Sequence, residues 1–226
     1  FLRGFWVDPR QHPDFAWAWI TRFLVSLGNA LATLYLLFYL KDAVKVDNAE
    51  QAQTYVILAY AIGSIVTAVY SGKLSDRSGR RKIYVVVSSL VMAGASFILA
   101  FFPTLTATLV ASLILGLGYG VYLAVDQALI TQVLPNAQDR GRDLGVINIA
   151  NAAPQVLAPV IAAPIVVGAT GYVGLYVLTG LGLLVLREMS DRSFHSVMDL
   201  QNSLGLPVLA AVPDAAAAAR GAGRFR

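Results

Sequence analysis

Charged side chains beside or inside long apolar segments are the residues of this chain best suited to chemistry. Residues 72–82 contain five Lys or Arg among eleven positions, between the uncharged segments 53–72 and 83–102. Positive charge alone would anchor such a segment at one surface of a membrane. Positive charge does not explain Asp76 or the turn residue Gly79. A carboxylate beside a helix N-terminus is stabilised by the helix dipole, and it can pair with arginine.

Asp126 is an acidic residue inside an apolar segment. It precedes Pro135 by nine positions, which is about 13 Å along a helix at 1.5 Å per residue. A charge at that depth in a membrane usually faces a cavity or a partner. Arg22, near the start of the first apolar segment, is the candidate partner. Two interpretations stay open: a structural pair with Arg22, or a carboxylate that takes up a proton and couples transport to a proton gradient.

Side-chain amides form a second candidate set. Asn148, Asn151 and Gln155 are spaced by three and four residues, so one helix face carries all of them. Together with Asn29 and Gln127 they are candidate contacts for a sugar or another neutral polar solute. They are equally suited to hydrogen bonds between helices. We expect the aromatic residues to serve mainly in interfaces and packing: Trp17, Trp19, Tyr35, Tyr39, Tyr60, Tyr119 and Tyr122.

Other kinds of chemistry have little support. The chain has no cysteine, which excludes disulfides and thiolate metal sites, and its two histidines, His12 and His195, lie in opposite terminal segments. The glycines of 116–120 lie inside an apolar helix rather than after a strand, so they are no dinucleotide fingerprint. No nucleophile, base and orienting group form a set. We expect no enzyme, no cofactor and no metal site.

Composition indicates a membrane protein. Of the 226 residues, 57% are hydrophobic and 13% charged, whereas soluble domains carry about 25% charged residues. The net charge of +4 comes from basic residues in short connections, which favours lipid headgroups over nucleic acid as the neighbour. Segments of about 20 apolar residues can span a bilayer as helices. Six are expected: Ala16–Leu40, Gln53–Gly72, Ile83–Phe102, Thr106–Leu134, Leu144–Val167 and the shortest, Gly171–Leu186.

The expected fold is therefore all-α, a polytopic bundle of six transmembrane helices. Residues 1–15 form a cytoplasmic linker, 16–186 the bundle and 187–226 a cytoplasmic tail, disordered in part. Within the bundle, Gly116 and Gly120 form a G-x-x-x-G pair that lets another helix approach closely. Prolines at 154, 159 and 164 favour bends in the fifth helix.

The distribution of basic residues predicts the orientation. Arginine and lysine concentrate in the N-terminal segment, in 72–82, at 140–142 and after residue 186. The connections on the other side hold only Lys41 and Lys45, partly offset by acidic residues. Basic connections stay on the cytoplasmic side. Both termini are therefore expected there.

The segment 72–82 matches the signature G-x-x-x-D-R-x-G-R-R of the major facilitator superfamily, and it lies where that family has it, between the second and third helices of a six-helix half. The chain resembles such a transporter over residues 1–178. The resemblance implies a secondary transporter of a small solute in the bacterial cytoplasmic membrane. It also implies that the signature residues gate the cytoplasmic helix ends, with Asp76 and Arg77 foremost: Gly72, Asp76, Arg77, Gly79, Arg80 and Arg81.

Two features favour the C-terminal half of such a transporter. Ser112 occupies the place where N-terminal halves usually have an arginine, four residues before a glycine-rich run, and the polar opening segment resembles the end of a central cytoplasmic loop. Residues 126–135 and 139–145 also resemble the tenth helix and following loop of bacterial members. The missing N-terminal half, or a second copy of the chain, is then the expected partner.

Residues 186–213 depart from this family. They are similar to the segment after the last membrane helix of polysaccharide chain-length determinants and the related bacterial tyrosine kinases, which favours a fusion with its seam near Gly180. The tail therefore leaves an alternative function open, a membrane-anchored regulator or scaffold of polysaccharide chain-length control. That family normally has two spans, and the six expected here argue against it.

Overall fold

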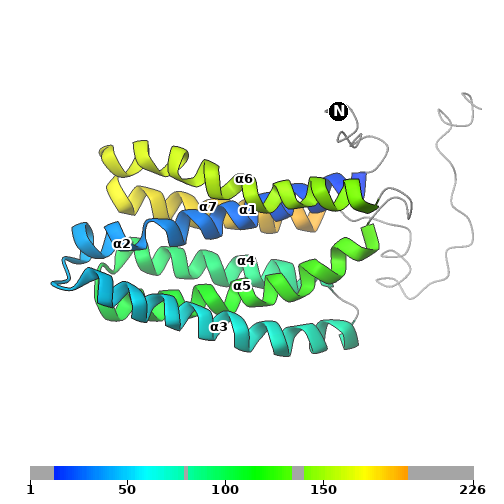
Figure 1. The fold of residues 1–226 in the computed structure, drawn as a ribbon, viewed down its shortest axis with the longest axis horizontal. Helices are drawn as coiled ribbons and strands as arrows, with labels where there is room; N and C mark the ends of the chain where they lie inside the picture. Colours follow the sequence, from blue (N-terminus) through cyan, green and yellow to red (C-terminus); the bar gives the residue numbers. More distant parts are fainter. Residues whose placement is uncertain (1–12, 79–80, 134–139, 193–226) are drawn as a thin grey trace, which may run out of the picture. The chain divides into compact units, whose positions relative to one another are not determined.

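The described part of the chain is helical throughout its regular structure. The computed structural model describes residues 13–78, 81–133 and 140–192 (Figure 1). The chain divides into two units, Phe1–Asp191 and Arg192–Arg226. All the described helices lie in the first unit, except for Arg192, the last residue of α7. The elements are α1 Pro13–Leu34, α2 Leu36–Tyr39, the π-helix η2 Leu40–Val44, α3 Ala49–Ser78, α4 Arg81–Phe101, α5 Leu105–Val133, α6 Arg140–Val167 and α7 Gly171–Arg192.

Five of the described helical segments are long and apolar enough to cross a membrane. They are Ala18–Val44, Ala49–Ser75, Ile83–Phe101, Leu105–Asp126 and Gly145–Val167. The apolar part of α7, Gly171–Leu186, is shorter, and it coincides with the sixth and shortest of the expected spans. These helices confirm the all-α, multi-pass bundle. Beyond the end of α7, the expected tail 187–226 lies outside the described residues, and so does most of the segment 186–213 for which a polysaccharide-type resemblance was expected.

The first expected span, Ala16–Leu40, is not one continuous α-helix. The chain leaves α1 after Leu34, and Tyr35 has φ −94° and ψ 3°, outside helical geometry. A short α2 and the π-helix η2 follow, and Lys45 then closes η2 in the left-handed region with φ 57°. No glycine or proline stands at the break, which explains why sequence patterns alone miss it. Short π-helical segments are often associated with functional sites.

The basic segment is not a loop over its whole length. Helix α3 continues to Ser78 and α4 begins at Arg81, so only residues 79–80 fall between them. The expected spans ended at Gly72 and began again at Ile83, with a loop between them; that expectation is wrong for most of residues 72–82, which are helical. Nothing in Lys73-Leu74-Ser75 breaks a helix, and charged side chains at the end of a long helix can reach the headgroup region beyond the hydrocarbon. Asp76, Arg77, Arg80 and Arg81 have no described side chains.

Helix α5 is packed between α3 and α4, and its glycines permit the approach. A Cβ atom on Gly116 or Gly120 would collide with the backbone of Tyr60 or Ser64 in α3. On α4, a Cβ on Gly118 would lie 2.7 Å from Met92 Cγ. The G-x-x-x-G pair thus sits at a close contact between α3 and α5, as expected from its spacing.

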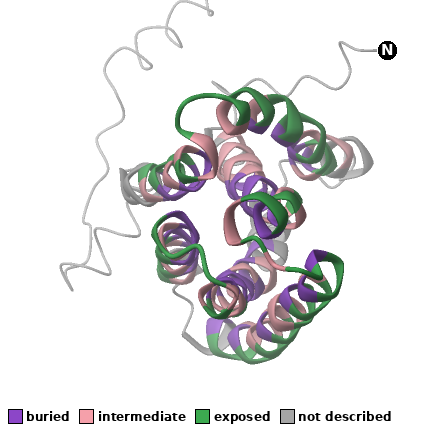
Figure 2. Cartoon of the chain, turned by 90° about the vertical axis from the view of Figure 1, so that its left-hand side faces the viewer, coloured by how far each residue is buried: buried purple, intermediate pink, exposed green. Residues whose placement is uncertain are grey.

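Helices α1, α6 and α7 pack together through small and branched side chains. Ala30 and Leu31 of α1 share a buried cluster with Ala158 and Ala162 of α6 and Leu175 of α7. A second cluster joins α1 and α7 to α4 and α5, through residues such as Val25, Met92, Leu115 and Leu183. In Figure 2, buried positions lie on helix faces that are turned toward neighbouring helices, and exposed positions lie on the outer faces. The core therefore runs through all the long helices.

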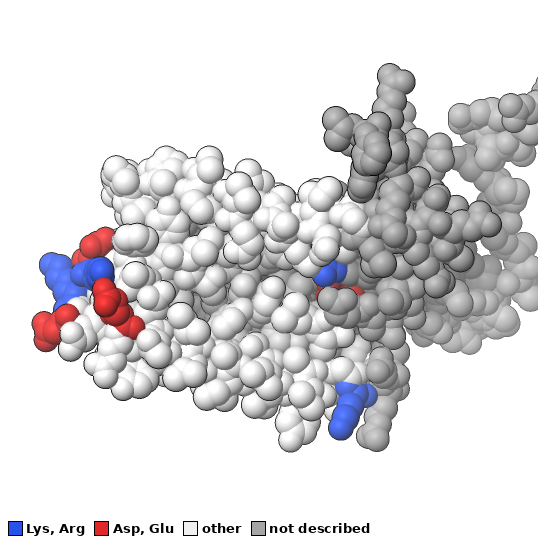
Figure 3. Space-filling model, in the orientation of Figure 1, with Lys and Arg blue, Asp and Glu red and all other residues white. Residues whose placement is uncertain are grey.

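The surface in Figure 3 is uncharged along most of the helices. Charged and exposed residues gather instead where α2, η2 and α3 meet: Lys41, Asp42, Lys45, Asp47 and Glu50. Apolar side chains lie outward between the helix ends, among them Ile65 and Tyr70 of α3 and Val156 and Val160 of α6. An apolar surface with charges confined to the ends of the helices suits a protein surrounded by lipid.

Candidate functional site: a buried polar cluster between α1, α5 and α6

Arg22 and Asp126 form a buried ion pair between α1 and α5. The Nη1 atom of Arg22 lies 2.9 Å from Oδ2 of Asp126, and the two side chains are 6% and 7% exposed. Removing two charges from water is costly unless they are paired and hydrogen-bonded. The structure therefore places the two residues in the direct contact that the first interpretation of Asp126 requires.

Helix α6 supplies a second partner for Arg22. The Nε–H group of Arg22 donates to Oδ1 of Asn151 at 2.8 Å, and the hydroxyl of Ser26 donates to the same oxygen at 3.3 Å. One turn before Arg22, the indole N–H of Trp19 donates to the carbonyl of Val146 at 2.8 Å. Arg22 thereby links α1 to α5 and α6 at once.

Tyrosines of α3 and α5 border the cluster. The hydroxyl of Tyr122 donates to Oδ1 of Asp126 at 3.0 Å, while Oδ2 faces Nη1 of Arg22 as an ion pair without hydrogen-bond geometry. Tyr119 lies between two rings: its centroid is 6.1 Å from that of Tyr122 and 6.2 Å from that of Tyr60. Tyr60 in turn donates its hydroxyl to Oδ1 of Asn29 at 3.0 Å. A continuous polar and aromatic path therefore leads from Asp126 to Asn29.

The cluster extends from one end of the bundle toward its middle. Arg22 is only about 6 Å along the helix from the start of the span Ala18–Val44, whereas Asn29 is about 16 Å along it. Asp126 is the last residue of its span, Leu105–Asp126. The ion pair therefore lies near the end that carries the basic segment, while Asn29 and Tyr60 lie near mid-membrane depth.

Not all of the predicted site residues come together. Asn148 and Gln155 are exposed on α6, although they share a helix face with Asn151. The side chain of Gln127 is not described. Gly72 is half-buried, and a Cβ atom there would lie 3.9 Å from Ala124 Cβ of α5. The gating residues 76–81 have no described side chains, so their contacts stay predictions.

The sequence did not identify four residues as direct partners in the cluster: Ser26, Tyr60, Tyr119 and Tyr122. One signal was available for α1. Arg22, Ser26, Asn29 and Thr33 follow spacings of four, three and four residues, which puts polar side chains on one face of an otherwise apolar helix. The tyrosines gave no such signal, because aromatic residues are equally common in packing and at membrane interfaces.

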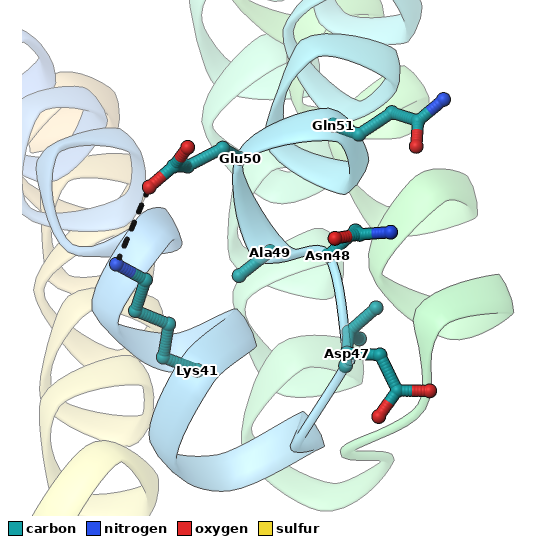
Figure 4. A pocket seen from close by; sticks show the side chains of 7 residues that line it. Lys41, Asp47, Asn48, Ala49, Glu50 and Gln51 are labelled. Atoms are coloured by element: carbon teal, nitrogen blue, oxygen red, sulfur yellow. Dashed lines mark ion pairs between the residues drawn. The ribbon is translucent and has the colours of Figure 1, made fainter.

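A second polar region lies at the opposite end of α1. A cavity of about 360 Å³ lies where η2 meets the start of α3. Nζ of Lys41 lies 3.8 Å from Oε1 of Glu50, and Figure 4 shows this ion pair among the side chains that line the cavity. Nearby, the hydroxyl of Tyr172 in α7 donates to Oδ2 of Asp42 at 2.6 Å. These exposed contacts tether η2 to α3 and α7. Among the described residues, no group of three or more His, Cys, Asp or Glu could hold a metal ion.

Comparison with known proteins supports one family. The family model of the Major Facilitator Superfamily matches residues 18–187. The multidrug resistance protein MdtL of a Shewanella species is 33% identical over 159 residues, which cover 66% of this chain and 39% of the relative. MdtL of Klebsiella pneumoniae is 28% identical over 173 residues, covering 74% of the chain and 43% of the relative.

The niacin transporter NiaP of Acinetobacter baylyi is 34% identical over 123 residues, which cover 53% of the chain and 28% of the relative. The chain thus spans less than half the length of these curated relatives. The family model covers most of the helical bundle, and the bundle has the all-α, multi-pass architecture that composition and the apolar segments predicted. The chain belongs to the Major Facilitator Superfamily.

Proposed function

We propose that this chain forms one half of a secondary active transporter that moves a small solute across a bacterial cytoplasmic membrane by alternating access. The buried cluster around Arg22 and Asp126 carries this proposal. Ionisable residues inside membrane spans are rare and usually serve substrate, ion or proton pathways. A cluster that ties α1, α5 and α6 at one end of the bundle is suited to hold one conformational state and release it in the other.

We place the chain as the C-terminal half, with both termini in the cytoplasm. Ser112, which is fully buried in α5, supports this assignment because an arginine is typical of this place in N-terminal halves. The six-helix bundle would rock against a partner half, either the N-terminal six helices or a second copy. Exposed amides on α6, Asn148 and Gln155, fit contact with a partner or a water-filled pathway better than contact with lipid.

Asp76 and Arg77 are the proposed gating residues. They stand at the end of α3 that carries the basic segment, the same end as the Arg22–Asp126 pair. In our proposal they hold the cytoplasmic ends of the helices together in one state and release them in the other. The rest of the signature, Gly72, Gly79, Arg80 and Arg81, supports that contact through charge and turn geometry.

The solute contacts are proposed at mid-membrane depth. Asn29 and Tyr60 present an amide and a phenol to each other there, and Asn151 extends the polar surface toward α6. Asp126 is the proposed site of proton uptake, so that solute movement is coupled to the proton gradient. In the Asp126→Asn variant, solute uptake into vesicles that carry the complete transporter should no longer depend on pH. An unaltered pH profile of uptake would reject this role.

Alternating access can be tested without knowing the solute, because the chain has no cysteine. We would express the Asn29→Cys variant in its native membrane and prepare right-side-out and inside-out vesicles from the cells. A membrane-impermeant maleimide is then applied to each kind of vesicle. The proposal predicts labelling from both sides. Val25→Cys, at a fully buried core position of the same helix, is the matched control and should stay unlabelled. Labelling of position 29 from one side only, or from neither, would contradict alternating access at this site.

A further inference from the structure

An apolar groove of about 220 Å³ lies between α1 and α7, and its lining shares no residue with the polar cluster. The lining comes from three helices: Leu27 and Leu31 of α1, Leu178 and Gly182 of α7, and Ile161 of α6. Leu178 is 47% exposed and Gly182 is also exposed, so the groove is open to the outside of the bundle. A ligand can therefore enter it from the surroundings.

Two glycines account for the shape of the groove. At Gly28, α1 and α7 are in contact, because a Cβ atom there would lie only 2.9 Å from Cδ2 of Leu183. At Gly182, the next residue to Leu183, an added Cβ would meet nothing within 4 Å. The two helices thus touch at the buried side of the groove, and the missing side chain at position 182 leaves the space beside that contact open.

The groove lies deep in the membrane and has little polar character. Gly28, which lines it, is about 15 Å along the span that begins at Ala18, and the hydrocarbon core of a bilayer is about 30 Å thick. Thr179 is the polar side chain among the described lining residues, and its hydroxyl donates to the carbonyl of Leu175 in its own helix at 2.8 Å. Sites for polar solutes carry a few well-placed polar groups. This groove therefore favours an apolar ligand.

The surface next to the groove is also apolar. The exposed side chains described on α7 include four large ones, all of them apolar: Val173, Leu178, Leu181 and Val185. Helix α6 differs, because Asn148 and Gln155 are exposed among its apolar residues. A partner half that brings polar groups or a water-filled pathway therefore suits the exposed face of α6, whereas lipid suits the exposed face of α7.

We propose that the groove binds one acyl chain of a bilayer phospholipid, which lies along α7 at Leu178 and Gly182 and packs against Leu27 of α1. Helices in membranes associate mainly through van der Waals packing, and atoms that border an empty space lose such contacts. A linear chain that enters from the lipid side restores them. This inference goes beyond the proposed function, since it requires membrane insertion but no particular solute.

Photo-crosslinking tests the site in the purified full chain. The probe is a phosphatidylcholine with a diazirine midway along one acyl chain, added in increasing amounts to protein in cholate, a steroid detergent without a linear chain. After irradiation, mass spectrometry locates the adducts. Adducts at Leu27 and Leu178 should reach a plateau as the probe increases. Adducts at Ile65, which is 64% exposed on α3, should rise in proportion to the probe. A proportional rise at all three positions would reduce the groove to ordinary lipid contact and overturn the inference.

Filling the groove should remove the site. In the Gly182→Leu variant the new side chain occupies the open space, so the adducts at Leu27 and Leu178 should be lost while Ile65 is labelled as in the parent. Gly94→Leu on α4 is the matched control, because Gly94 is also an exposed helical glycine with nothing within 4 Å of an added Cβ. It should keep all the adducts. Gly182→Ala, a smaller change, should weaken labelling of the groove in part. Groove labelling that stays at the parent level in both folded variants at position 182 would contradict the proposal.

Thermal unfolding gives a second readout. A lipid that binds the folded chain stabilises it, so phosphatidylcholine should raise the melting temperature of the delipidated parent and of Gly94→Leu. The rise should be smaller in Gly182→Leu. An equal rise in all three proteins would contradict a lipid site at the groove.

Other occupants give different results. Displacement of the probe from the groove by naphthalene, but not by unlabelled phosphatidylcholine, would assign the groove to a compact apolar solute. Groove labelling in the isolated chain that disappears in membranes carrying the complete transporter would assign it to a helix of the partner half. Either result would overturn the inference, whereas displacement by phosphatidylcholine and labelling in both preparations would support it.

Discussion

Arg22 and Asp126 join α1 to α5 through an ion pair of 2.9 Å that is almost fully buried. Removing one partner leaves the other charge buried without compensation, which costs about 3–5 kcal/mol in comparable pairs. We expect Arg22→Ala and Asp126→Ala each to lower the melting temperature of the detergent-purified chain strongly. The neutral pair in Arg22→Gln/Asp126→Asn should recover much of the loss. If the single and double variants had the same melting temperature, the two charges would not stabilise each other.

The contact between α3 and α5 depends on the absence of a side chain at Gly120. An added Cβ would collide with Ser64 and Thr67 of α3, and overpacking of this kind typically costs about 1–3 kcal/mol. Gly120→Ala should therefore destabilise the chain in thermal unfolding. Gly94→Ala is the matched control on α4, because nothing lies within 4 Å of its added Cβ. Equal effects at the two positions would contradict the close approach.

Much of the architecture follows from hydropathy and small-residue spacing. The apolar segment ending at Val167 and the one starting at Gly171 coincide with the ends of helices in the structure, because Gly168 to Gly171 supply a turn that a spanning helix cannot continue through. The break at Tyr35 had no such marker. It is held by tertiary contacts, among them the Tyr39 hydroxyl on the carbonyl of Leu99, and a single sequence does not reveal contacts of that kind.

The candidate site could also be predicted only in part from the sequence. A charge inside an apolar segment has to be paired, so Arg22 and Asp126 could be matched from the sequence. The rotation of each helix about its axis could not be read with equal certainty. Asn151 and its face-mates Asn148 and Gln155 differ in burial because only Asn151 points to α1.

Two tyrosine hydroxyls at the opposite end of the bundle should differ in their contribution. Tyr39 donates to Leu99 O at 2.7 Å in a buried position, whereas the bond from Tyr172 to Asp42 is exposed. Removing a buried donor costs about 1–3 kcal/mol, since a buried acceptor loses its partner. Tyr39→Phe should therefore lower the melting temperature more than Tyr172→Phe. The reverse order would indicate that the exposed contact is the one that holds η2 in place.

Gating by the basic segment predicts a defect in rate rather than in assembly. Asp76→Ala should insert in the membrane at the parent level but switch more slowly between the two states. The measurement is the rate of maleimide labelling of Asn29→Cys from each side, with Asp47→Ala, in the turn before the other end of α3, as control. An unchanged labelling rate from both sides at equal protein level would contradict a gating role for Asp76.

The central claim is that the helices cross a membrane with the basic segment on the inner side, and single cysteines test it most directly. Lys45→Cys, Pro103→Cys and Gly168→Cys should react with an impermeant maleimide applied to intact cells. Lys73→Cys and Gln138→Cys should react only after the cells are permeabilised. Labelling of Lys73→Cys in intact cells, or protection of Pro103→Cys there, would contradict the arrangement described here.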